Sequence, residues 1–139
     1  MKKYKKITAI VIMVLILCSS IIAYASYDLK TTSDSYYGYT LEGYASCNKS
    51  TTTFYFSGWS DTYYTLDQRS YLVDSLKLYL DCYKNGVLYA GYYSYPNNTS
   101  WVYSSSPSYS YSSSDSISVF GTHQSDKGSR SLYLFTFAN

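Results

Sequence analysis

The residues able to support acid–base or nucleophilic chemistry are few in this sequence. His123 is the only histidine, and it stands in a Gly-Thr-His-Gln stretch near the C-terminus. A Ser-His-Asp triad would have to recruit a serine and either Asp115 or Asp126 to this ring. Serines are abundant and no G-x-S-x-G element occurs, so the combination has no specificity. We expect His123 to lie in a loop or at a strand end with local hydrogen bonds.

The carboxylates show no catalytic or metal-binding spacing. A glycosidase needs two of them facing each other across a cleft. Asp81 is the only one set between aromatic neighbours, Tyr79 and Tyr83, and its simplest interpretation is a solvated aspartate on a strand. Calcium-loop, phosphate-loop and dinucleotide-binding motifs are all missing from the sequence. The sequence therefore predicts a protein that is not an enzyme and that carries no cofactor and no metal.

The cysteines predict one disulfide. Cys18 lies in the apolar N-terminal segment, which leaves Cys47 and Cys82 in the rest of the chain. Two cysteines and one histidine do not make a tetrahedral zinc site. In an exported protein, an even number of cysteines predicts a disulfide. Closing the loop of about 36 residues between them would stabilise the fold by about 4 kcal/mol. Two free thiols, or a bridge between chains, are the alternatives.

Aromatic side chains are the feature that points to a binding function. The chain contains 21 tyrosines, two tryptophans and five phenylalanines. Exposed Tyr and Trp rings are favoured wherever a protein surface meets a ligand, including the flat faces of sugars. The candidate contacts are three tyrosines expected on the outer face of a hairpin and two tryptophans expected in or beside loops: Tyr79, Tyr83, Tyr92, Trp59 and Trp101. Packing against a second sheet or another subunit is the alternative role.

The elements that must position these residues are strands. Residues 76–83 alternate with period two and precede Asn85-Gly86, which favours the type I′ turn of a tight hairpin. With these two residues at the tip, the core face would hold Leu76, Leu78, Leu80, Cys82, Tyr89, Gly91, Tyr93 and Tyr95. The outer face would hold Lys77, Tyr79, Asp81, Tyr83, Leu88, Ala90, Tyr92 and Ser94. A helix over residues 72–83 is the alternative to the strand, because apolar residues there also recur at a spacing of three to four. A short helix within 66–73, after a capping-box pattern, is compatible with both alternatives.

The other segments complete an all-β pattern. Strand-like runs cover residues 39–47, 51–57, 116–121 and 131–137, with loops expected at 58–65 and 123–130. The serine-rich segment 104–114 contains Pro107, which restricts it to an edge strand or a loop. Strands at this spacing predict a small antiparallel β-sandwich of about seven strands, Ig-like or jelly-roll-like.

Residues 1–25 have the order of a secretory signal peptide. Four lysines come first, an apolar run covers 7–17, and Ala23-Tyr24-Ala25 precedes Ser26. We expect this helical segment to be cleaved between Ala25 and Ser26. The mature chain would then consist of a flexible N-terminus, 26–35, and one β-sandwich domain, 36–139. An uncleaved membrane anchor and a lipoprotein modified at Cys18 are the alternatives.

Removal of this segment reverses the net charge. The full chain has a formal charge of +2, and loss of four lysines leaves seven scattered basic and nine acidic residues, a net −2. A chain without a basic patch is not expected to bind nucleic acid, and cleavage leaves no segment for stable membrane insertion. Lysine in excess over arginine, with much Tyr, Ile and Asn, is typical of an AT-rich bacterial genome.

Together these features predict a secreted, non-enzymatic protein. Its expected partner is a cell-wall or extracellular glycan, or another protein, bound through exposed aromatics. A bacteriocin-like antimicrobial and a self-associating structural surface protein are the alternative functions, and an N-terminal membrane anchor is the alternative location.

Overall fold

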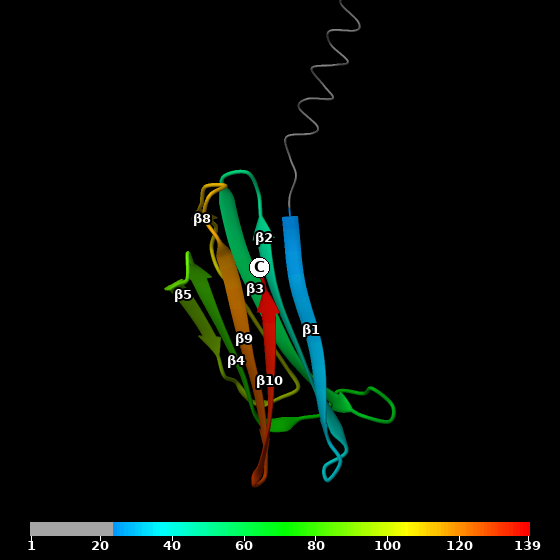
Figure 1. Ribbon diagram of the computed structural model, residues 1–139. Coiled ribbons are helices and arrows are strands. Elements are labelled where there is room, and N and C mark those ends of the chain that lie inside the picture. The colour runs from blue at the N-terminus through cyan, green and yellow to red at the C-terminus, as the bar shows by residue number, and fades with distance from the viewer. Residues whose placement is uncertain (1–23) are drawn as a thin grey trace, which may run out of the picture.

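The computed structural model describes residues 24–139, and this range is built from strands and turns (Figure 1). The signal-peptide prediction falls almost entirely outside the described residues. The strands are β1 (Tyr24–Asp34), β2 (Tyr39–Lys49), β3 (Thr53–Tyr64), β4 (Val73–Lys84), β5 (Val87–Ser94), β6 (Asn97–Thr99), β7 (Trp101–Ser105), β8 (Tyr109–Ser110), β9 (Ile117–Lys127) and β10 (Arg130–Ala138). The helix considered within 66–73 is wrong, because 65–67 form a turn and β4 begins at Val73.

Two antiparallel sheets pack face to face, which confirms the predicted β-sandwich. The first sheet has the order β1-β2-β3-β7, with β8 also pairing with β3. The second has the order β10-β9-β4-β5, with β6 also pairing with β4. Figure 1 shows β10, β9, β4 and β5 as one layer, and β1 of the other layer lying beside β10.

The core lies between the sheets because inward positions on the long strands are apolar. In β4 every second residue from Leu76 to Cys82 is completely buried, as the period-two pattern predicts. Phe54 and Phe56 of β3 face them from the first sheet. Full burial of each such side chain stabilises the fold by roughly 1.5–3 kcal/mol.

Residues 26–35 are not the flexible segment that their polar sequence predicts. They form most of β1, which pairs with β2 along its whole length, from Tyr24 opposite Lys49 to Asp34 opposite Tyr39. Polar side chains at alternate β1 positions also bond to the backbone of β10 and of Asn139, which directly follows it. The bonds join Ser26 Oγ to the Asn139 N–H (2.8 Å), Asp28 Oδ2 to the Phe137 N–H (2.9 Å), and Lys30 Nζ to the Phe135 carbonyl (3.0 Å). Since hydrogen bonds rather than apolar burial hold β1, hydrophobic periodicity does not reveal it.

The β4–β5 hairpin has the predicted turn but not the predicted register. Asn85 and Gly86 have φ of 54° and 78°, the positive values that a type I′ turn requires. A β-bulge then shifts the pairing, so that Cys82 lies opposite Ala90 rather than Tyr89. The Tyr89 ring packs against the ring of core Phe54. Beyond the bulge, the predicted faces of β5 are therefore exchanged.

Two segments expected to be loops continue as strands. β3 runs through 58–64 and β9 runs through 123–127. Their small and polar residues face inward at positions where large side chains of the opposite sheet fill the space. A Cβ at Gly58 would lie 2.7 Å from Cδ2 of Leu80, so this glycine makes room for a core leucine. The sequence resembles a loop because the apolar partner lies on another strand.

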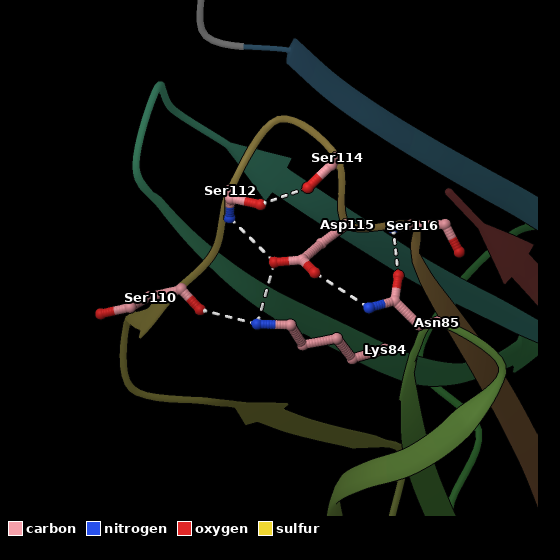
Figure 2. A network of polar contacts seen from close by, with 7 residues as sticks. All are labelled: Lys84, Asn85, Ser110, Ser112, Ser114, Asp115 and Ser116. Atoms are coloured by element: carbon pink, nitrogen blue, oxygen red, sulfur yellow. Dashed lines mark hydrogen bonds and ion pairs between the residues drawn. The ribbon is translucent and has the colours of Figure 1, made fainter.

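The serine-rich segment is fixed by a polar network at the tip of the β4–β5 hairpin (Figure 2). Asp115 accepts hydrogen bonds from the Ser112 N–H and from Asn85 Nδ2, both at 2.9 Å, and pairs with Lys84 Nζ at 3.0 Å. Asn85 Oδ1 in turn accepts the Ser116 N–H at 2.8 Å. The Ser112 backbone, followed by Asn85 and Lys84, lowers the pKa of Asp115 well below its usual range. We call these residues the hairpin clasp.

Candidate functional site

The five predicted contact aromatics do not form one site. Trp59 and Trp101 lie on the outer face of the first sheet, in strands β3 and β7 rather than in loops. Tyr79 and Tyr83 lie on the outer face of the second sheet, as expected. Tyr92 is turned inward by the bulge, where its hydroxyl bonds to that of Tyr109 at 2.8 Å.

The outer face of the first sheet carries an aligned set of aromatic side chains. Tyr44 of β2 lies directly opposite Trp59 of β3, and Trp59 lies directly opposite Tyr103 of β7. Tyr27 and Trp101 extend this set on the two outermost strands. We call these five residues the Trp/Tyr face.

The rings of the Trp/Tyr face are arranged in near-parallel pairs. The Tyr44 and Trp59 centroids are 5.6 Å apart with planes inclined by 10°, and those of Trp101 and Tyr103 are 6.0 Å apart with planes inclined by 3°. Trp101 is 53% exposed and Tyr27 is 68% exposed. Tyr27, Tyr44 and Tyr103 were missed by the sequence analysis, because only the pairing register brings them beside the tryptophans.

Two carboxylates flank this aromatic set. Glu42 and Asp61 lie directly opposite each other, and Asp61 also lies opposite Trp101. Burial raises the pKa of both groups, and the charge of Asp61 raises that of Glu42 further. Neither forms an ion pair within residues 24–139. The face therefore offers hydrogen-bond acceptors and negative charge beside its rings.

A shallow pocket adjoins the same face. Its volume is about 250 Å³, and its lining includes Asn48, Tyr55 and Ala25, the residue before the expected cleavage site. Pockets for drug-sized ligands span roughly 300–1,000 Å³ and enclose most of the ligand. The geometry here favours contact along an extended surface over enclosure of a small molecule.

His123 is a core residue, so its predicted place in a loop or at a strand end is wrong. It is completely buried in β9 and joins the two sheets through side-chain hydrogen bonds. Its Nδ1 lies 2.8 Å from Oγ of Ser60 in β3, and its Nε2 lies 2.9 Å from Oγ1 of Thr136 in β10. Glycines leave space for the ring: a Cβ at Gly43 would lie 2.5 Å from its Cγ.

The environment of His123 suits structure rather than catalysis. Burial lowers the pKa of the imidazole to about 4, so the ring is neutral at pH 7. Ser60 and Thr136 are themselves buried, and a hydroxyl rather than a carboxylate bonds the second ring nitrogen. Neither Asp115 nor Asp126 bonds to the ring; they belong to the hairpin clasp and to an ion pair with Lys77.

Cys47 and Cys82 face the core from opposite sheets, and both thiols are free in the structure. Both side chains are completely buried. Burial raises the pKa of the Cys47 thiol, and burial together with the nearby Cys47 raises that of Cys82 to about 12. Both groups are therefore protonated at neutral pH, and the predicted disulfide is not present in the structure.

Other functional features are few within the described range. Residues 24–139 contain no group of three or more potential metal ligands, and no helix in this part of the chain is long and apolar enough to cross a membrane. No family model matches the chain, and comparisons with curated proteins and with solved structures give no significant match. The Trp/Tyr face is thus the candidate site that the geometry supports best.

Proposed function

We propose that this chain is a secreted, non-enzymatic β-sandwich that binds a neutral polysaccharide of the cell envelope or extracellular space along its Trp/Tyr face. The observation that carries the proposal is the register-aligned set Tyr44, Trp59 and Tyr103 across three strands. Rings held on a rigid sheet lose little conformational entropy on binding, which favours recognition of an extended ligand.

The chemistry of the flanking residues supports a sugar polymer. Pyranose rings present apolar C–H faces to aromatic rings and hydroxyl groups around their rims. The hydroxyls can donate to the carboxylates of Glu42 and Asp61, which have no cationic partner in the described residues. The same two carboxylates repel polyanions, so anionic wall polymers and nucleic acids are disfavoured.

Retention on insoluble polysaccharides tests this function. The secreted protein would be incubated with the neutral polysaccharides cellulose and chitin, and with anionic peptidoglycan sacculi for comparison, and bound protein measured at low and high salt. We expect at least one neutral polymer to retain it with little salt dependence, and Trp59→Ala together with Trp101→Ala to weaken retention by at least about tenfold.

The matched control is Tyr95→Ala, which removes a 66%-exposed tyrosine from the segment between β5 and β6, away from the Trp/Tyr face. It should be retained like the wild type. Thermal melting of each variant confirms that it is folded. Equal retention of the wild type and the double variant on every polymer would contradict the proposal.

Export would also change the state of the two cysteines, and we propose that Cys47 and Cys82 form an intrachain disulfide in the secreted protein. Their inward positions on facing sheets support this pairing. Two thiols would lose two protons and two electrons to an oxidant of the disulfide class and form one S–S bond.

Mass spectrometry of protein recovered from the culture medium tests both cleavage and oxidation. We expect a chain that begins at Ser26, with no titratable thiol, that gains two hydrogen masses on reduction. The oxidised form should be about 4 kcal/mol more stable to unfolding than Cys47→Ser/Cys82→Ser, in the chain-entropy account of cross-linking. Two free thiols in freshly secreted protein would exclude the disulfide.

A further inference from the structure

The outer face of the second sheet is unusually apolar for a surface that faces water. Three of the five phenylalanines of the chain lie on it, whereas Phe54 and Phe56 are in the core. An antiparallel sheet with one solvated face normally places polar side chains there. We call this surface the Phe face; its members are Tyr79, Tyr93, Phe120, Tyr133, Phe135 and Phe137.

The register makes this surface continuous. Phe120 of β9 lies opposite Phe137 of β10, with ring centroids 4.8 Å apart. Tyr79 of β4 lies opposite Tyr93 of β5, with centroids 5.4 Å apart, and Thr122 links Tyr79 to Phe135 across the sheet. The four strands lie side by side as one layer in Figure 1.

We propose that the Phe face is the interface of a face-to-face dimer with a second copy of this chain. Five of its aromatic side chains are 41–62% exposed, and at about 200 Å² each they leave about 500 Å² open to water. This lies near the top of the range for the largest patch on a soluble monomer, about 300–600 Å². Two such faces together bury about 1,000 Å², the lower bound for a specific interface.

The Phe face has few charges, which favours an apolar partner such as a second copy over a strongly charged one. Lys77 forms an ion pair with Asp126 at 3.0 Å, so the two together have no net charge that would attract an acidic or a basic protein. Asp81 is the remaining charged group among the aromatic rows, and the Tyr93 hydroxyl lies 3.4 Å from its carboxylate. An aromatic face with a single unpaired charge packs against a second copy mainly by apolar contact, as the two sheets do inside the sandwich.

Sedimentation velocity of the secreted protein over a dilution series tests the interface. We expect a reversible dimer with a dissociation constant of about micromolar order, because the buried area is at the low end for stable complexes. Phe135→Lys changes the most exposed phenylalanine, at 62%, and should weaken the dimer by at least about tenfold. Tyr27→Lys makes the same change on the Trp/Tyr face and should leave the dimer intact.

Thermal melting separates loss of the interface from loss of the fold. Phe135 is an outward residue on a strand, so Phe135→Lys should melt cooperatively as a monomer, near the melting temperature of dilute wild type. A wild type that is monomeric at every concentration would overturn the proposal. If that monomer sedimented with phosphatidylcholine vesicles, a lipid surface would be the occupant instead. A dimer insensitive to Phe135→Lys but disrupted by Tyr27→Lys would place the interface on the opposite sheet.

Discussion

At the scale of single residues, His123 makes stability depend on pH. Burial lowers the pKa of the imidazole from about 6.5 to about 4. The unfolded chain therefore binds a proton before the folded chain does, and stability falls as pH drops from about 6.5 to about 4. The difference in pKa corresponds to about 3 kcal/mol. Urea unfolding at a series of pH values should show this loss.

The variant His123→Gln isolates the contribution of the ring. Glutamine does not titrate, so the free energy of unfolding of this variant should not fall in this way as the pH drops. The variant should be less stable than the wild type at pH 7. Glu42 and Asp61 have raised pKa values and act in the opposite direction, because folded carboxyls of this kind bind protons more readily. Since both proteins contain them, the difference between the two curves reports His123. Curves that stay parallel from pH 7 to pH 4 would contradict this assignment.

At the scale of elements, the hairpin clasp holds the serine-rich segment. Its carboxylate, Asp115, bonds the Ser112 backbone, Asn85 and Lys84, and these contacts lower its pKa (Figure 2). We expect Asp115→Asn to melt at a lower temperature at pH 7 and to be cleaved faster by proteases within 106–116. The contribution of the Asp115 carboxylate to stability is present above the ordinary carboxyl pKa and is lost as the pH falls through the lowered pKa of the folded state. The melting temperatures of the wild type and Asp115→Asn should therefore converge in strong acid.

Asp67→Asn is the matched control for the clasp. Asp67 also has a lowered pKa and an ion pair, but its side chain is 46% exposed against 16% for Asp115, and its partner Arg69 lies two residues away. Its replacement should change neither the melting temperature nor the cleavage of 106–116 by a comparable amount. Equal effects of the two substitutions would mean that the clasp adds nothing beyond a surface ion pair.

The hairpin also shows how far local sequence determines an element. Asn85-Gly86 predicts the turn correctly because the positive φ angles depend on those two residues alone. The bulge at Tyr89 is not predictable in this way, since the Tyr89 ring packs against Phe54 of the other sheet. The one-residue shift reverses the faces of β5, which moves Tyr92 inward and brings Tyr93 to the surface. The error in the candidate site follows from this tertiary contact.

At the scale of the whole molecule, period-two burial was sufficient to predict the sandwich but not its surfaces. Alternating apolar and polar residues predict strands such as β4. In contrast, β1 is held by hydrogen bonds to β2 and β10, and its sequence has no such alternation. The sequence predicts part of the Trp/Tyr face: it indicates Trp59 and Trp101 as candidate contacts, but Tyr44 and Tyr103 become their neighbours only through the strand register.

The two aromatic surfaces lie on opposite sides of the sandwich, and this arrangement connects the two proposals. A dimer formed through the Phe face would direct both Trp/Tyr faces outward, away from each other. Two sites that point in opposite directions cannot bind one flat surface together, so dimerisation would add little avidity there. They can, however, hold two separate polymer chains. If both proposals hold, the dimer cross-links polysaccharide chains. Each copy has one Trp/Tyr face, and the exposed phenylalanines join two copies into a bivalent protein.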